Sequence, residues 1–305
     1  GMEYYKGAIM HSIEYDDPSI FADKNVLCIG GRASGADLAR EISAFASKVY
    51  LSDTTCPTLD EGKPIVEGNV LWVPRTTAIN QDSTIQFGGS MDDPSSNPCS
   101  DNPKVDIIIF CSGYDYQFPF INDESNLDLS AVSGERRIKP LYEHLWHARH
   151  PSVTFVGLSH SVVPFPFFEL QAEALVSQLL KRTSSESVAD PDSWSLPALE
   201  ERMKIAEKDA TCGGPNDPGR LQDTHFLGNY QWDACLKYAS FAGFCDESLQ
   251  QYIATNKAIY DHSGAMRKGT FPGGPDDYRY NTYVRDDENQ SFEVKTLLEQ
   301  KQIAQ

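Results

Sequence analysis

The feature that most constrains this sequence is an apolar run, a glycine-rich turn and an amphipathic stretch that follow one another without a break. Residues 25–29 read NVLCI and end at a glycine, which is typical of a strand buried in a parallel sheet. From Ser34 onward, Leu38 and Ile42 recur at helical spacing, and residues 48–52, KVYLS, predict a second strand. The segment therefore predicts a strand, helix, strand unit with a right-handed crossover.

The turn between the first strand and the helix has the composition of a dinucleotide-binding loop. It reads GGRASG. Its first glycine allows a tight turn, its last allows the helix to pack close to the strand, and the N–H groups at a helix N-terminus attract phosphate. The candidate cofactor-binding residues of this loop are Gly30, Gly31, Arg32, Ala33, Ser34 and Gly35.

Arg32 stands where such loops usually have a middle glycine, which lets the backbone approach the pyrophosphate. The arginine either lies in solvent or folds over the ribose or its 2′-phosphate. Ser52 and Asp53 end the second strand, and Asp53 lies at about the distance expected of an acceptor for a ribose 2′-hydroxyl. The aspartate favours NAD and the arginine favours NADP, so these residues alone leave the cofactor open. Ser34 either caps the helix or donates to a phosphate.

Charge and cysteine content limit the kinds of partner. The formal net charge of −18 disfavours nucleic acid and anionic membrane surfaces, and no apolar run approaches bilayer length. Seven scattered cysteines form no C-x-x-C pair, which predicts reduced thiols and a cytoplasmic location. No metal site is expected from His144, His147 and His150.

The remaining chain predicts an α/β protein. The expected further strands are 66–75, 83–89, 105–116 and 151–157, and the expected helices are 168–182, 196–208 and 230–244. Pro197 occupies a first-turn position of the second of these helices. The last fifth of the chain is rich in aromatic residues and is expected to be irregular.

Five segments in chain order resemble those of one enzyme family. Tyr5, Gly7, His11 and Tyr15 resemble the F-x-G-x-x-x-H-x-x-x-Y motif of the flavin-containing monooxygenases, with tyrosine for the phenylalanine. Further matches are DIIIFCSGYDYQFPF at 106–120, PFPFFELQAEAL at 164–175, LPALEERM at 196–203 and the segment 225–243. The sequence is identified as a member of this family. It is most similar to plant-type S-oxygenating members, whose glycine turn also lacks the middle glycine.

The resemblance implies a fold, two cofactors and a reaction. The fold is a Rossmann-like NADP-binding domain (19–109) after a linker carrying the identifying motif (1–18), followed by the C-terminal part of an FAD-binding domain (110–305). The reaction is an NADPH- and O2-dependent oxygenation of sulfur or nitrogen in small molecules, through a C4a-hydroperoxyflavin. Ser112, Gly113 and Gln171 become candidate cofactor contacts. The cofactor carries the chemistry, so no catalytic side chain is assigned.

The sequence departs from the family in lacking the FAD-binding glycine loop. Its start, GMEYYKG, resembles P-G-x-E-x-F-x-G, so Gly1 is expected to be internal to a longer protein, or else a tag remnant. Exposed apolar surface is then expected to cause self-association or to be covered by an N-terminal FAD-binding segment. The alternatives are a Baeyer–Villiger-type flavoprotein, whose related motif ends in tryptophan where this chain has Tyr15, and a non-catalytic nucleotide-binding fragment.

Overall fold

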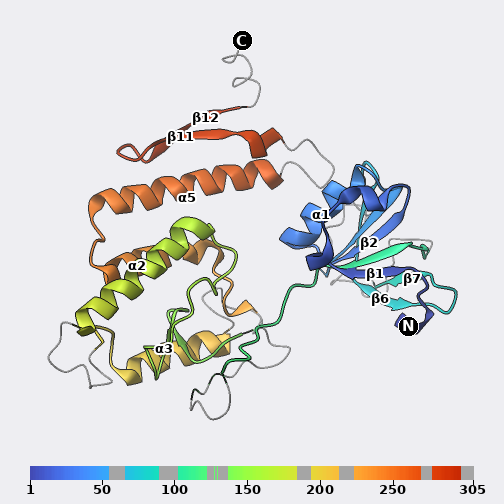
Figure 1. Cartoon of the computed structure of the whole chain (residues 1–305). Helices are drawn as coiled ribbons and strands as arrows, with labels where there is room; N and C mark the ends of the chain where they lie inside the picture. The colour runs from blue at the N-terminus through green and yellow to red at the C-terminus, as the bar shows by residue number, and fades with distance from the viewer. Residues whose placement is uncertain are drawn as a thin grey trace. The chain divides into compact units, whose positions relative to one another are not determined.

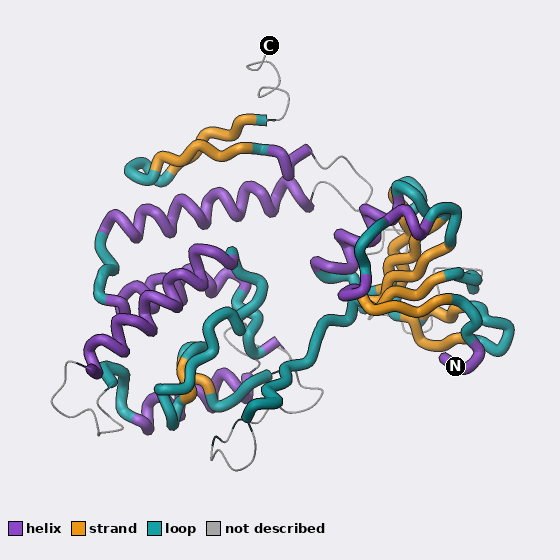
Figure 2. Tube along the Cα trace, in the orientation of Figure 1, coloured by secondary structure: helices purple, strands orange, loops and turns teal. Residues whose placement is uncertain are grey.

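The computed structural model of this 305-residue chain forms two compact units. It describes residues 1–54, 66–88, 102–121, 127, 129, 137–183, 194–212, 223–268 and 277–296. Unit 1 comprises Gly1–Gly113, Gly264–Asn281 and Thr296–Lys301, and unit 2 comprises Tyr114–Ser263, Thr282–Lys295 and Gln302–Gln305. Figures 1 and 2 show the mixed α/β composition, which confirms the predicted fold class.

Unit 1 is built on a six-stranded sheet with the order β1-β8-β2-β3-β5-β4. The strands are β1 Ala8–His11, β2 Asn25–Ile29, β3 Lys48–Ser52, β4 Val66–Glu67, β5 Val70–Val73 and β8 Ile107–Phe110. Neighbouring strands run parallel except for β4 and β5. The two strands expected on either side of the crossover are confirmed residue for residue.

The two faces of this sheet are covered differently. Helix α1, Ala33–Ser43, packs Ala39 and Ile42 on one face, against Val26 and Cys28 of β2. The opposite face carries Leu27 and packs against the hairpin of β6 Thr76–Ile79 and β7 Ile85–Phe87. Consecutive residues of β2 point to opposite faces, so a strand buried on both sides must be apolar throughout.

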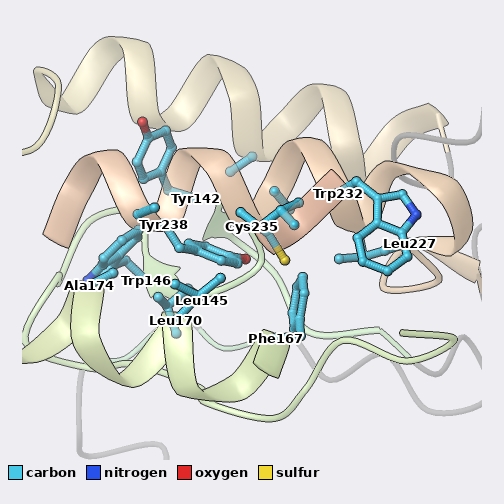
Figure 3. Close-up of a cluster of buried hydrophobic side chains, with 14 of the residues drawn as sticks. Tyr142, Leu145, Trp146, Phe167, Leu170, Ala174, Leu227, Trp232, Cys235 and Tyr238 are labelled. Atoms are coloured by element: carbon cyan, nitrogen blue, oxygen red, sulfur yellow. The ribbon is translucent and has the colours of Figure 1, made fainter. Parts of the chain in front are cut away.

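Unit 2 is mainly helical. Its helices are α2 Pro164–Thr183, α3 Leu199–Cys212, α4 Gln231–Ala242 and α5 Glu247–Lys268, and its strands are β9 Leu141–Tyr142, β10 Trp146–His147, β11 Thr282–Asp286 and β12 Ser291–Lys295. The shorter helices among the described residues are η1 Met2–Tyr4, η2 Ser12–Glu14, η3 Pro18–Phe21, η6 Gly228–Tyr230 and η7 Asp277–Tyr280. Figure 3 shows the core of unit 2, where the β9–β10 hairpin meets α2 and α4 around Trp146, Phe167 and Tyr238.

Several sequence predictions for these elements were wrong. The strand expected at 105–116 covers only Ile107–Phe110. The segment 151–157 is not a strand. Only Thr154 forms a β-bridge, an isolated one with Trp146, and the Val153 N–H donates to the His150 carbonyl in a turn. Pro197 precedes α3 by two residues instead of lying in its first turn. The expected 66–75 strand is a β4–β5 hairpin whose second strand joins the sheet parallel to β3.

The C-terminal fifth is also more ordered than the sequence predicts. Helix α5 is 22 residues long, and β11 and β12 form an antiparallel hairpin. Leu249, Tyr252, Ile253 and Tyr260 on α5 pack against the core of unit 2 at helical spacing. That spacing is the signal that the loop-like composition around it obscured.

Candidate nucleotide-binding site

The carboxyl ends of five parallel strands, β1, β8, β2, β3 and β5, form one edge of the unit 1 sheet. The chain leaves β2 through α1 to reach β3 on one side, whereas β8 and β1 lie on the other side of β2. The strand order therefore reverses between β2 and β8. Open α/β sheets bind ligands at the carboxyl ends of their strands, at such a reversal.

Gly30 lies directly at this reversal. Its φ of +111° is a conformation that side-chain-bearing residues rarely adopt. A Cβ atom here would lie 2.6 Å from the carbonyl oxygen of Cys111. The Gly30 N–H donates to the carbonyl oxygen of Ser52 at 2.8 Å. A Cβ on Gly35 would collide with the carbonyl of Gly30, so the first turn of α1 lies directly on the loop. These are the close approaches that the sequence predicts for these two glycines.

Gly31 brings the end of β3 into the same site. A Cβ on Gly31 would lie 2.8 Å from Oδ2 of Asp53. The other carboxylate oxygen of Asp53 accepts hydrogen bonds from the Thr54 N–H at 2.6 Å and the Thr54 hydroxyl at 3.3 Å. The structure therefore places Asp53 beside the loop.

The loop presents its remaining residues to solvent. Arg32, Ala33 and Ser34 are exposed. Arg32 is the N-cap of α1 in an extended conformation, and within the described residues no side chain caps the helix. Ser34 is the second helical residue, so the capping role suggested for it is wrong. The first N–H groups of α1 have no carbonyl partner within the helix, which is the arrangement that attracts an anion.

Ser52 has a structural set of contacts. It is buried, its hydroxyl donates to the Pro74 carbonyl at 3.0 Å, and its oxygen accepts from the Thr76 N–H at 2.8 Å and the Thr76 hydroxyl at 2.9 Å. These bonds hold the end of β3 to the chain after β5. The cofactor contact of Ser52 stays a prediction, and its hydroxyl is already engaged inside unit 1.

Ser112 and Gly113 reach the same edge from β8. Both are exposed, and the amide nitrogen of Ser112 lies 3.4 Å from the position of a Cβ on Gly30. Nδ1 of His11 accepts from the Ile13 N–H, so Nε2 carries the proton and donates to the Gly113 carbonyl at 3.3 Å. His11 thus ties the end of β1 to the turn after β8.

Gln171 belongs to unit 2 and is fully buried. Its amide oxygen accepts from the Gly157 N–H at 3.0 Å, and its amide nitrogen donates to the Tyr238 hydroxyl at 3.2 Å. The Tyr238 hydroxyl in turn donates to the Glu143 carbonyl at 2.7 Å. The flavin contact stays a prediction, and both ends of the amide are engaged in the fold of unit 2.

Two features near the loop were not expected to have a role. Arg279 of η7 donates to Oδ1 of Asp37 on α1 at 2.6 Å, and Arg40 donates to the same oxygen at 2.9 Å. Sequence patterns give no signal for a contact across 242 positions.

Beneath the loop, the buried thiols of Cys28 and Cys111 interact. Their hydrogen bond, together with burial, raises the pKa of Cys28, and the same bond lowers the pKa of Cys111.

The described residues hold neither a metal-binding cluster nor a membrane-spanning helix. No three His, Cys, Asp or Glu side chains in this part of the chain are grouped closely enough to hold a metal ion. None of its helices combines the length and the apolar composition needed to cross a bilayer.

Comparisons with known proteins agree with this geometry. The family model described as Flavin-binding monooxygenase-like matches residues 1–64. Flavin-containing monooxygenase FMO GS-OX5 of Arabidopsis thaliana is 31% identical over 266 residues, which cover 85% of this chain and 51% of that protein. Flavin-containing monooxygenase FMO GS-OX-like 9 of the same plant is 28% identical over 80% of this chain and 48% of its own length.

Solved structures show the same likeness. The S-allyl-L-cysteine S-oxygenase of Allium sativum has a TM-score of 0.67 at 26% identity, covering 95% of this chain and 58% of that one. Tmm of Pelagibacter sp. strain HTCC7211 shares the fold, with a TM-score of 0.58 at 17% identity over 96% of this chain and 57% of its own. The chain spans about half the length of the curated relatives that it matches. Over the part that it spans, the chain is similar to the flavin-containing monooxygenases.

Proposed function

We propose that unit 1 binds NADPH at the loop Gly30–Gly35 and serves as the nicotinamide-binding part of a flavin-dependent monooxygenase. The observation that carries this proposal is the glycine cradle at the strand reversal. Side chains at Gly30, Gly31 and Gly35 would fill the space that the backbone and Asp53 already occupy. The open N-terminus of α1 then lies where a pyrophosphate would meet backbone N–H groups.

The choice between NADPH and NADH is proposed to depend on Arg32. The residue is exposed at the N-cap of α1, within reach of a ribose 2′-phosphate bound at this edge. Asp53 opposes it, because a carboxylate at the end of the second strand suits a 2′-hydroxyl and repels a 2′-phosphate. We place the preference with NADPH because an arginine can bind phosphate through two parallel hydrogen bonds. When bound, NADPH supplies a hydride for reduction of a flavin.

The flavin itself does not find a comparable cradle in the described residues. Within them a strand, glycine loop and helix occur in this arrangement once, at Gly30–Gly35, and the amide of Gln171 is engaged in packing. No step through a flavin is therefore derived from these side chains. We propose that a further FAD-binding segment completes the enzyme. The half-length match supports this, as do the exposed rings of Phe120 (80% exposed) and Phe165 (87% exposed).

We further propose small molecules with a soft sulfur or nitrogen atom as substrates, with O2 as co-substrate, and a cytoplasmic location. One relative favours sulfur, since the protein of Allium sativum is an S-allyl-L-cysteine S-oxygenase. A non-catalytic nucleotide-binding subunit is the second candidate, because the chain matches only about half of each relative.

The test uses the full chain in two measurements. Calorimetric titration with NADPH is expected to show saturable binding, and an absence of binding would contradict the proposal. The visible spectrum after addition of FAD and removal of free cofactor then tests the need for a further FAD-binding segment. NADPH binding without retained flavin is expected if that segment is needed, whereas a retained flavin band together with NADPH oxidation stimulated by a thioether would show that this chain alone is an enzyme and needs no such segment.

A further inference from the structure

The turn between β9 and β10 is held in a conformation that its residues disfavour. Glu143 and His144 have φ values of 49° and 55°, in the left-handed region that usually takes glycine or asparagine. Both are buried, with 6% and 3% of their surface exposed. A conformation of this kind persists only where surrounding contacts hold it.

Two directed hydrogen bonds and a longer contact with Asp209 provide those contacts on the His144 side. The Ile138 N–H donates to Nε2 of His225 at 2.9 Å, so the proton of His225 must lie on Nδ1. That proton points at Nδ1 of His144, 3.3 Å away, so His144 carries its own proton on Nε2. Nε2 of His144 faces Oδ2 of Asp209 on α3 at 3.6 Å. These contacts therefore fix one tautomer for each ring.

This arrangement leaves no ring nitrogen available for a second proton. Protonation of His225 would place its Nε2–H against the Ile138 N–H, and protonation of His144 would place two Nδ1–H groups face to face. Burial also disfavours the charged rings, and as the largest cause it lowers the pKa of His144 to about 4 and that of His225 to about 3. Burial also raises the pKa of Asp209 to about 6, so Asp209 is the first of the three to gain a proton as the pH falls.

The other charged groups around the two rings come from three further places. Lys237 on α4 donates to both carboxylate oxygens of Glu143 at 2.9 Å, and both residues act on Asp209. Lys208 lies beside Asp209 on α3. His160 and Arg137 lie beside His225, and a positive charge on either of them lowers the pKa of His225.

We propose that Asp209, His144 and His225 form a proton-operated latch on the turn Glu143–His144. At neutral pH both rings are neutral and the latch is closed. Below about pH 6 the equilibrium constant for opening rises, because each released ring can take up a proton that it cannot accept while the latch is closed. The latch does not depend on which nucleotide or flavin the protein binds.

Opening of the latch would reach two neighbouring parts of unit 2. The His225 backbone accepts from the His160 N–H at 2.9 Å, and the Leu227 N–H donates to the His160 carbonyl at 3.1 Å, so the segment before α2 is tied to it. On the hairpin, Tyr142, Leu145 and Trp146 enter the core that Figure 3 shows. Acidification is therefore expected to loosen the hairpin and the His160 segment together.

Hydrogen exchange with mass spectrometry on the full chain tests the latch between pH 6 and pH 5, after correction for intrinsic exchange. Two histidines gain protons on opening while Asp209 loses one, so the opening constant of the peptide 138–148 is expected to rise roughly tenfold. Asp209→Asn keeps an acceptor for His144 but has no proton to lose on opening. The opening constant of the same peptide should therefore rise roughly fiftyfold. His225→Gln keeps an acceptor for the Ile138 N–H and should leave a rise of less than about twofold.

His262→Gln is the matched control, because His262 belongs to unit 2 and hydrogen-bonds Tyr283, away from the latch. It should follow the wild-type pH dependence. The proposal is overturned if the wild-type peptide opens equally at both pH values, or if Asp209→Asn has the slope of the control. Asp209→Asn is nearly isosteric, so this second criterion holds even if His225→Gln does not fold.

Discussion

The carboxylate of Asp53 lies against the backbone of Gly31, with Oδ2 2.8 Å from where a Cβ atom on Gly31 would stand. The contact joins the loop after β2 to the end of β3, the two places that together read the ribose in folds of this type. It also fixes a negative charge next to the proposed site of a 2′-phosphate. Asp53 and Arg32 should therefore have opposite effects on cofactor choice.

Replacing Asp53 by Asn should shift binding toward NADPH. Loss of the carboxylate removes repulsion from a 2′-phosphate and an acceptor for a 2′-hydroxyl, so the NADPH-to-NADH affinity ratio should rise by roughly tenfold. Calorimetric titration with both cofactors measures this ratio. Asp16→Asn, an exposed carboxylate of the same unit, should leave it unchanged. An unchanged ratio in Asp53→Asn would remove Asp53 from the ribose site.

Replacing Arg32 by Ala should have the opposite effect. A charge-assisted hydrogen bond to phosphate contributes about 1.5–3 kcal/mol, so NADPH affinity should fall by roughly ten- to a hundredfold while NADH affinity changes little. Lys24→Ala removes a surface cation of the same unit and serves as the control. Equal losses for both cofactors would show that Arg32 does not read the 2′-phosphate.

Gly35→Ala should destabilise unit 1. The added methyl group meets the carbonyl of Gly30, so α1 must move away from β2 at a cost of about 1–3 kcal/mol. Gly264 lies in α5 with open space around it, so Gly264→Ala should stabilise by about 0.5–1 kcal/mol through helix propensity. Urea unfolding compares the two variants. Equal stabilities would mean that the loop and helix are not packed as described.

Lys237→Met should destabilise unit 2. Glu143 is buried, and both of its carboxylate oxygens accept from Lys237, so the variant leaves a carboxylate without its cation. Breaking a fully buried pair costs about 3–5 kcal/mol, and the partial exposure of Lys237 reduces the expected loss to about 2 kcal/mol. The exposed pair of Lys257 and Asp261 provides the control, where Lys257→Met should cost less than about 1 kcal/mol. Similar losses for both variants would show that burial of Glu143 does not matter.

The local pattern around β2 was enough to predict the nucleotide loop. An apolar run, a glycine turn and helical spacing are signals carried by neighbouring residues. Both strands agree residue for residue, and the helix begins one residue before the predicted start. The same holds for α4, which ends at Gly243 with a φ of 89°. Local chemistry decides such elements.

Features that depend on distant residues could not be predicted in the same way. The role of Gln171 depends on Gly157 and Tyr238, and the tautomers of His144 and His225 depend on Ile138 and Asp209. Such contacts arise only when separate elements pack together. Likewise, β5 joins the sheet beside β3 although its sequence alternates like a hairpin strand. The roles predicted for Ser52 and Gln171 depend on such distant contacts.

Titration of the full chain with NADPH, with and without 2′,5′-ADP as competitor, most directly tests whether Gly30–Gly35 is a nucleotide site. The structure predicts one saturable site per chain, displaced by 2′,5′-ADP and weakened at least tenfold in Arg32→Ala. Absence of binding by the folded wild-type chain at millimolar NADPH, or binding that neither 2′,5′-ADP nor Arg32→Ala affects, would contradict it.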